Sequence, residues 1–420
     1  MEKIIVRGGR KLQGEVDISI AKNSVLPIIV ATILNPTEII LKKVPMLEDV
    51  TVLINLLREL NCEVQFSSIT GDLKINTLNL KEVDPNSELI RKMRASFLVM
   101  GPMLARFGRC KISMPGGCNI GSRPVDLHLK GFKSLGIESE MGYGYVEAKV
   151  DKLHGNRIYL DFPSVGATEN IMMAAILAPG ITVIENAAEE PEIWDLARFL
   201  NSMGAKIEGA GYGKITIHGV SQLKQPEPFT PIFDRIEAGT FMVAAGITNS
   251  KITINGVNEE HLMPTIEKLK ECGVYCSIDG QKMIVDGTQE KKPVDIKTMP
   301  YPGFPTDMQA QIMALLSITR GVSVITETVF ENRFMHVGEL GRMGANIKID
   351  GRIAIVEGVS TLTGCEVKAT DLRAGAAMIL AGLVANGETE IGEVYHIDRG
   401  YTNIEEKFKK LGAEIYRIHK

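Results

Sequence analysis

The chain has 420 residues, too many for one ordinary hydrophobic core, so its length favours two domains. Hydrophobic residues make up 45% of it and charged residues 23%, which is the balance of a soluble globular enzyme. The formal net charge is only −4, and no run of five or more lysines and arginines occurs. The composition therefore argues against a nucleic-acid-binding protein.

Targeting signals and membrane segments are not expected from this sequence. Residues 1–8 lack the apolar region of a signal peptide, and apolar stretches such as 171–179 are far too short to span a bilayer. The cysteines form no CxxC pair and have no histidine at zinc-site spacing; they are Cys62, Cys110, Cys118, Cys272, Cys276 and Cys365. We therefore expect a cytoplasmic protein with reduced thiols, no metal, no cofactor, and no membrane or nucleic-acid partner.

A short signature recurs six times, each time at the end of a predicted helix. Its final residues are Asn61, Gly136, Gly204, Gly273, Gly344 and Gly412, which lie 75, 68, 69, 71 and 68 positions apart. Glycine and asparagine are the residues that most readily adopt the left-handed conformation of a helix C-cap. The sequence therefore predicts six copies of one repeat of about 70 residues.

Each repeat is predicted to run strand, helix, strand, helix, strand, strand. In the fourth copy an Ala-rich and Met-rich helix over 238–247 precedes an alternating strand at 251–254. The signature helix over 269–273 follows, and a later strand ends in glycine at 282–287. A repeat of this size is a supersecondary block rather than a solenoid unit.

The last copy stops at Lys420 without its final strand, and residues 3–8 match the missing strand. We therefore predict that the chain crosses between its domains twice. One domain is expected over 22–232, and the second over 1–21 and 233–420. Each would hold three repeats, which gives an α/β fold with pseudo-threefold symmetry in both domains.

Polar residues begin the first helix of every repeat, although the rest of that helix is apolar. They are Lys22 and Asn23, Arg94, Ser164 and Thr168, Asp234 and Arg235, Thr306 and Asp307, and Asp371 and Arg373. Free N–H groups and a partial positive charge at a helix N-terminus attract anions. We therefore expect six such helix ends to form one polar cleft. Considered alone, Asp307 is predicted to be an N-cap.

The loop over 115–124 reads Pro-Gly-Gly-Cys-Asn-Ile-Gly-Ser-Arg-Pro. Its three glycines allow the backbone to approach a ligand closely, and Cys118 stands between them rather than in a core position. A thiol near cations or a helix end shifts its pKa readily, so it can act as an acid or a nucleophile. A turn with an incidental cysteine is the alternative for this loop.

Eleven segments along the chain match, in order, the motifs of one known family. They are 21–24, 93–96, 115–118, 121–128, 164–168, 190–193, 234–237, 304–309, 331–336, 371–374 and 397–401. On these segments the chain resembles the UDP-N-acetylglucosamine 1-carboxyvinyltransferases, which are enolpyruvyl transferases. The resemblance implies two domains of three repeats each, described as an inside-out α/β barrel, in agreement with the repeat.

The resemblance implies transfer of enolpyruvyl from phosphoenolpyruvate to the 3′-hydroxyl of UDP-N-acetylglucosamine, with release of phosphate. The implied route is addition and then elimination through a tetrahedral ketal, as the first committed step of peptidoglycan precursor synthesis. Both substrates are small molecules. No protein partner is implied.

By the same resemblance, two residues are catalytic and several bind phosphoenolpyruvate. Cys118 matches the thiol assigned as general acid or in product release. The resemblance also implies inhibition by the epoxide phosphonate fosfomycin, which we expect to attack this thiol. Asp307 matches a general base near the sugar hydroxyl. Phosphoenolpyruvate carries nearly three negative charges, so several cations must surround it. The implied binding set is Lys22, Asn23, Arg123, Arg373 and Arg399.

The implied contacts of UDP-N-acetylglucosamine are Asn23, Arg94, Arg123, Pro124, Val125, Asp126, Leu127, Ser164, Val165, Gly166, Asp307 and Val329. Phe162 stands where some relatives have a lysine. Glu190 and Glu192 also match carboxylates of the family, but alone they resemble acids at a helix start. His128 is expected to be packed rather than catalytic. The glycines over 209–214 are expected in a hairpin.

Three other functions compete with this one. The shikimate-pathway enolpyruvyl transferase shares the fold and phosphoenolpyruvate but lacks the cysteine loop, so Cys118 argues against it. RNA 3′-phosphate cyclases have similar repeats, but the charge of this chain disfavours RNA binding. Against a non-catalytic UDP-sugar-binding relative stands only the intact set of Cys118, Asp307 and the cations, and a measurement of turnover decides it.

Overall fold

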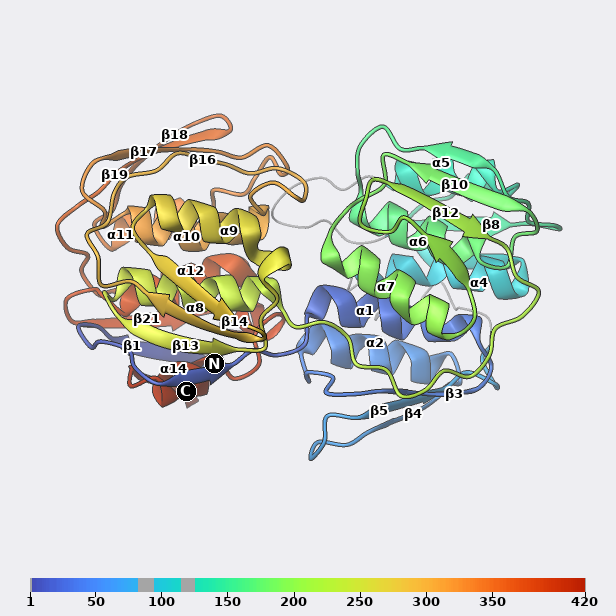
Figure 1. Ribbon diagram of the computed structural model, residues 1–420, viewed down its shortest axis with the longest axis horizontal. Helices are drawn as coiled ribbons and strands as arrows, with labels where there is room; N and C mark the ends of the chain where they lie inside the picture. Colours follow the sequence, from blue (N-terminus) through green and yellow to red (C-terminus); the bar gives the residue numbers. More distant parts are fainter. Residues whose placement is uncertain (1, 82–93, 115–124, 420) are drawn as a thin grey trace. The chain divides into compact units, whose positions relative to one another are not determined.

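The computed structural model describes residues 2–81, 94–114 and 125–419, without the side chains of 94–96. These residues fall into two compact units, drawn in Figure 1. The central unit contains the described residues of 20–232. The terminal unit contains 2–19 and 233–419, so it includes both ends of the described chain.

The central unit contains three copies of the repeat. The first consists of α1 (Lys22–Ala31), η1 (Thr32–Leu34), β3 (Glu38–Leu41), α2 (Glu48–Glu59), β4 (Glu63–Phe66) and β5 (Leu73–Asn76). The second consists of η2 (Arg94–Val99), α4 (Met100–Phe107), β6 (Arg109–Ser113), α5 (Asp126–Ser134), β7 (Glu138–Met141) and β8 (Tyr145–Lys149). The third consists of β9 (Arg157–Tyr159), α6 (Val165–Ala175), β10 (Ile181–Glu185), α7 (Pro191–Ser202), β11 (Lys206–Glu208) and β12 (Lys214–His218).

The terminal unit contains three further copies. The fourth consists of β2 (Glu15–Asp17), α8 (Arg235–Ile247), β13 (Lys251–Asn255), α9 (Glu259–Glu271), β14 (Tyr275–Asp279) and β15 (Lys282–Asp286). The fifth consists of β16 (Ile296–Lys297), η3 (Thr306–Met308), α10 (Gln309–Leu316), β17 (Val322–Thr326), α11 (His336–Arg342), β18 (Asn346–Asp350) and β19 (Ile353–Glu357). The sixth consists of β20 (Glu366–Lys368), α12 (Leu372–Gly382), β21 (Glu388–Gly392), α13 (Tyr395–Asp398), α14 (Ile404–Lys410), β22 (Glu414–His419) and β1 (Glu2–Arg7).

The sheets of the terminal unit share one topology. Their strand orders are β14-β15-β13-β2, β16-β17-β19-β18 and β20-β21-β1-β22. In each, the first strand of the repeat runs parallel to its neighbour and the other pairs are antiparallel. β1 lies antiparallel between β21 and β22, in the place that β19 has in its own sheet. The predicted order of strands and helices is therefore confirmed in the terminal unit, whereas the described residues of the first two copies form three-stranded sheets that lack the opening strand.

Helices fill the interior of each unit, and the sheets lie outside them. In the terminal unit α8, α10 and α12 contact one another, and nearly every residue of these helices is buried. Helices that are apolar on all sides are stable only in such a core. Gly375 on α12 permits close packing, because a Cβ there would lie 2.4 Å from Ile397. Because the rest of each helix is buried in the core, the polar residues at its N-terminal end are the ones available to form a site.

A search of the described helices for a candidate membrane span found none that is both long enough and apolar enough.

Candidate functional site

Side chains cap three of the interior helices at their N-termini, as the helix-start pattern indicates. Asp234 accepts hydrogen bonds from two backbone N–H groups at the start of α8, and Asp371 does the same for α12. Ser164 accepts a hydrogen bond from the Ala167 N–H at the start of α6. A cap of this kind satisfies N–H groups that have no partner within the helix.

Asp307 does not cap its helix, so the N-cap prediction for this residue is wrong. η3 begins at Thr306 with Pro305 before it and no side-chain cap. The carboxylate instead accepts from two guanidinium groups. Arg333 Nη2 lies 2.8 Å from Oδ1, and Arg373 Nη2 lies 3.0 Å from Oδ2. Both arginines are buried, with 4% and 2% of their side chains exposed, and buried cations require a nearby counter-charge.

Arg373 connects this cluster to a buried hydroxyl network. Its Nη1 donates to the hydroxyl of Tyr401 at 3.3 Å, and that hydroxyl lies 2.9 Å from Thr240 Oγ1. Burial raises the pKa of Tyr401, so its hydroxyl keeps its proton. Burial opposes the charge of Arg373, but Asp307, Tyr401 and Asp234 together outweigh burial and raise the pKa of the guanidinium. The cluster therefore holds one carboxylate and two fixed positive charges.

The sequence did not identify two members of this cluster. Arg333 lies in the segment 331–336 that carried the family resemblance, and Tyr401 ends the segment 397–401, yet neither received a role. Its place in that family segment was the only signal for Arg333. Arg333 is buried beside Asp307, and this burial depends on tertiary packing rather than on the local sequence.

The other predicted residues of the terminal unit lie at element ends. Val329 follows β17, and its backbone N–H donates to Glu327 Oε1 at 2.8 Å. Arg399 is the C-cap of α13, directly after Asp398. Both oxygens of Asp398 accept hydrogen bonds from Arg417 on β22, at 2.9 and 2.7 Å, so the backbone beside Arg399 is anchored to the sheet.

In the central unit, Lys22 is the first residue of α1 and Asn23 the second. Lys22 Nζ lies 3.2 Å from Asp49 Oδ2 in the first turn of α2, and both side chains are largely buried. The ammonium group is therefore held at the N-terminal end of an interior helix, beside one carboxylate.

Two other predicted segments of the central unit come together. Val125 is the N-cap of α5, with Asp126 and Leu127 in its first turn, while Ser164 precedes Val165 and Gly166 at the start of α6. The two helices pack against each other.

His128 of α5 lies between these two helices. Its Nδ1 is 3.1 Å from Asn170 Nδ2, and its ring packs edge-on against Phe97. A Cβ at Gly166 would lie 3.4 Å from the imidazole ring, so the two helices meet closely there. The expectation that His128 is a packed residue is confirmed.

Some predicted residues lie outside the described part of the chain. These are Cys118, Arg123 and Pro124, all in the loop over 115–124, and the side chain of Arg94, whose backbone begins η2. Phe162 is described and is 45% exposed. The residues over 209–214 join the antiparallel strands β11 and β12, which confirms the predicted hairpin.

Glu190 and Glu192 stand at the start of α7, as N-cap and first-turn residue, which confirms their interpretation as helix-start acids. They also act on Glu169 of α6, which is 4% exposed. Burial, and then the charges of Glu192 and Glu190, raise the pKa of Glu169 well above its usual value.

We expect Glu169→Gln to stabilise the protein at neutral pH but not in acid. A carboxyl with a raised pKa keeps its proton in the folded state, whereas the unfolded chain releases it near pH 4.5. The contribution of Glu169 to folding stability is therefore greatest below that pH, and it falls as the pH rises towards the pKa of Glu169 in the folded state. Glutamine mimics the protonated acid, so it should raise Tm by on the order of a few degrees at pH 8.

Thermal denaturation of this variant at pH 4.5 and pH 8 tests the expectation. Glu208→Gln, at an exposed position of the same unit, is the control and should change Tm little at either pH. An equal gain for Glu169→Gln at both pH values would show that the fold does not protonate this residue.

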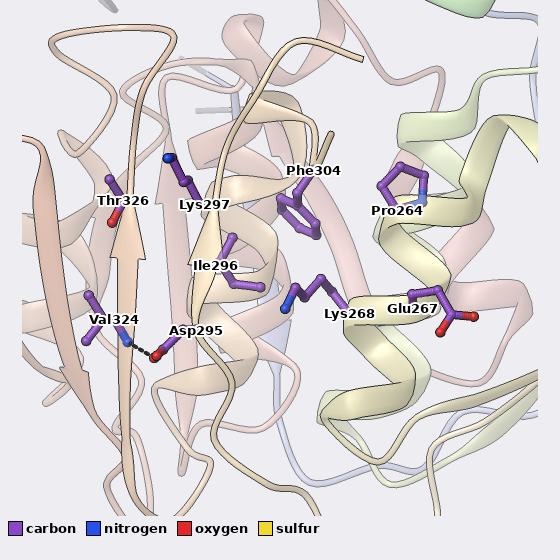
Figure 2. A pocket seen from close by; sticks show the side chains of 9 residues that line it. All are labelled: Pro264, Glu267, Lys268, Asp295, Ile296, Lys297, Phe304, Val324 and Thr326. Atoms are coloured by element: carbon purple, nitrogen blue, oxygen red, sulfur yellow. Dashed lines mark hydrogen bonds between the residues drawn. The ribbon is translucent and has the colours of Figure 1, made fainter. Parts of the chain in front are cut away.

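A cavity of about 440 Å³ lies in the terminal unit between α9, the edge strand β16 and its neighbour β17 (Figure 2). Its lining residues are Pro264, Glu267, Lys268, Asp295, Ile296, Lys297, Phe304, Val324 and Thr326. Charged residues of both signs alternate with apolar ones there. Asp295 Oδ1 is already occupied by the Val324 N–H, 2.8 Å away. None of the predicted site residues lines this cavity, so we do not identify it with the active site.

Comparison with known proteins assigns the class of this fold and site. Residues 6–408 match the model of the EPSP synthase family, described as 3-phosphoshikimate 1-carboxyvinyltransferase. The chain belongs to this family of enolpyruvyl transferases, and the resemblance seen in its sequence is confirmed.

Individual relatives match the chain at high sequence identity over its whole length. The chain is 65% identical over 418 residues to UDP-N-acetylglucosamine 1-carboxyvinyltransferase 2 of Clostridium tetani, with 100% of both chains covered. It is 63% identical over 418 residues to UDP-N-acetylglucosamine 1-carboxyvinyltransferase 1 of Clostridium acetobutylicum, again with full coverage of both.

Solved structures confirm the predicted fold class. The enolpyruvyl transferase NikO from Streptomyces tendae matches with a TM-score of 0.88 at 23% identity, covering 99% of this chain and 98% of NikO. An EPSP synthase from Acinetobacter baumannii matches with a TM-score of 0.75 at 18% identity and covers both chains fully. At such identities the likeness concerns the fold alone.

Proposed function

We propose that the protein transfers the enolpyruvyl group of phosphoenolpyruvate to the 3′-hydroxyl of UDP-N-acetylglucosamine and releases phosphate. The observation that carries this proposal is the similarity to proteins of that name, at 56–65% identity over 99–100% of the chain. The product would commit the sugar nucleotide to peptidoglycan synthesis. We accordingly propose a cytoplasmic location and a role in cell-wall biogenesis, cell shape, the cell cycle and cell division.

Asp307 is the general base of this proposal. It would take the proton from the sugar 3′-hydroxyl as that oxygen adds to the substituted carbon of phosphoenolpyruvate. Its side chain is 26% exposed, although the two arginines that bind it are buried. Each arginine donates to a different oxygen of the carboxylate. Because the side chain is partly exposed, a substrate hydroxyl can approach it.

Cys118 would supply a proton, or assist product release, from the glycine loop. Elimination of phosphate from the tetrahedral ketal then gives the enolpyruvyl ether. Addition followed by elimination changes no oxidation state overall, so the reaction needs no redox cofactor.

The cations of the proposal supply charge for the phosphate and carboxylate of phosphoenolpyruvate. They are Lys22, Arg123, Arg373 and Arg399, with Asn23 beside them. The raised pKa of Arg373 means that it stays charged, which suits an anion site. For the nucleotide sugar, the N-termini of α5 and α6 offer N–H groups to a diphosphate at Asp126 and at Val165 and Gly166.

Incubation of the protein with phosphoenolpyruvate and UDP-N-acetylglucosamine tests the proposal. We expect phosphate release that requires both substrates, together with a UDP-sugar product whose mass corresponds to one added enolpyruvyl group. A parallel reaction with 3-phosphoshikimate as acceptor tests the other activity named in the family description. Binding of UDP-N-acetylglucosamine without phosphate release would identify a non-catalytic relative.

A further inference from the structure

Glu327 is a buried carboxylate that the proposed reaction does not use. It follows the last residue of β17, and only 1% of it is exposed. Its two carboxylate oxygens accept four hydrogen bonds. Oε1 accepts from Thr298 Oγ1 at 2.8 Å, from the Val329 N–H at 2.8 Å and from the Phe330 N–H at 3.1 Å. Oε2 accepts from Thr306 Oγ1 at 2.9 Å.

These hydrogen bonds join three segments of the fifth repeat. Thr306 directly precedes the proposed base Asp307, and Val329 is a proposed contact of the nucleotide sugar. Thr298 follows β16 and also accepts a hydrogen bond from the Thr328 N–H at 3.0 Å. The Glu327 carboxylate therefore accepts hydrogen bonds from both the start of η3 and the turn after β17, and it keeps these two segments close together.

The burial of Glu327 makes this arrangement rigid. A buried N–H or carboxylate oxygen that loses its partner is costly, so none of the three segments moves away without leaving such a group. All four donors are neutral hydroxyl or backbone groups. The carboxylate therefore fixes geometry without supplying charge to another side chain.

We infer that Glu327 is a positioning residue, which holds the Asp307 carboxylate and the Val329 backbone at a fixed separation. This inference rests on the proposed function for its effect on turnover. Displacement of a reacting group by about 1 Å costs roughly 10²-fold in rate, so the position of η3 matters for the chemistry. The contacts that define the inference are independent of any substrate.

Three variants separate the hydrogen bonds of Glu327. Thr306→Val has nearly the same shape and removes only the bond to the segment of Asp307. Glu327→Ala removes all four bonds. Glu327→Gln keeps an acceptor for the Val329 and Phe330 N–H groups, and its amide can donate to the Thr306 hydroxyl.

We expect Thr306→Val to lower kcat roughly 10- to 100-fold with KM for UDP-N-acetylglucosamine changed less than about threefold. Glu327→Ala should lower kcat and also raise that KM, since the turn at Val329 is released. Glu327→Gln should recover most of the kcat lost in Glu327→Ala. Glu357 is an exposed residue of β19 that accepts a hydrogen bond from Asn346. The Glu357→Gln variant is the matched control and should leave kcat and KM unchanged.

Hydrogen exchange at the Val329 and Phe330 amides is measured on the same proteins without substrate. We expect strong protection in the parent and in Glu327→Gln, and faster exchange in Glu327→Ala.

If Glu327→Ala does not fold, Thr306→Val carries the kinetic test. Lower Tm with unchanged kcat and KM in Thr306→Val would make the contact merely structural and overturn the inference. A parent that releases no phosphate would refute the proposed function, whereas unprotected amides at 329 and 330 in the parent would refute the positioning role.

Discussion

Asp307→Ala is expected to lower kcat by roughly 10²–10⁴-fold while it affects the affinity for UDP-N-acetylglucosamine far less. A general base acts on the proton that moves in the reaction, so its loss is felt in the transition state. Binding of the nucleotide sugar depends mainly on other proposed contacts. Kinetics at saturating substrates and calorimetric titration of the nucleotide sugar measure the two effects separately.

The structure adds a stability effect to this prediction. Asp307 is the carboxylate between Arg333 and Arg373, and alanine would leave both buried guanidinium groups without it. Removing one partner of a buried ion pair costs about 3–5 kcal/mol, and the partial exposure of Asp307 makes a value at or below the lower end the expected one. Asp307→Asn keeps one oxygen acceptor and the side-chain shape, so it should lose less stability and a similar amount of kcat.

Asp350→Asn serves as the control for both variants, because Asp350 is exposed on β18 of the same unit. It should change neither kcat nor Tm appreciably. If the Asp307 variants lose nucleotide-sugar binding but turn over almost normally at saturation, then Asp307 is a binding residue and another group is the base.

Fosfomycin is expected to modify one cysteine only, Cys118. Its phosphonate resembles the phosphate of phosphoenolpyruvate and would be bound by the proposed cations Lys22, Arg123 and Arg399. The epoxide would then lie beside the thiol of the glycine loop. Positive charges favour the thiolate, so we expect Cys118 to ionise below the value of about 8.5 for a free cysteine.

The remaining cysteines are poor nucleophiles for a physical reason. Burial raises the pKa of Cys62, Cys110 and Cys276 to about 12. Burial also raises the pKa of Cys272, to about 11, and that of Cys365. At neutral pH such thiols hold very little thiolate, which is the reactive form. All five are free thiols in the structure, so a disulfide does not explain their protection.

Peptide mass spectrometry after incubation with fosfomycin and UDP-N-acetylglucosamine measures this selectivity. One adduct should appear, on the peptide containing Cys118, together with loss of activity. Cys118→Asp should escape modification and is expected to keep some activity, because a carboxylic acid can also donate a proton. Modification of Cys365, one of the two partly buried thiols, would show that the selectivity has another origin.

The sequence alone determined the repeat and therefore much of the fold. Helix and strand periodicity are local properties. The left-handed backbone at each signature end favours glycine or asparagine, as at Asn61 and Gly344, where φ is positive. The matching of residues 3–8 to a missing strand also needed only the repeat. The polar helix starts gave several residues of the proposed site, because helix N-termini attract anions and need polar caps.

Only the tertiary structure decided how the site residues are paired. Asp307 was predicted to cap its own helix, which is the usual local role of such a residue, but it binds Arg373, 66 positions away, and Arg333. The burial of Glu327 and the raised pKa of Glu169 likewise depend on segments far apart in the chain. Local pattern shows which residue can donate, accept or ionise. Which partner it meets, and whether water is excluded there, is determined by packing between distant segments.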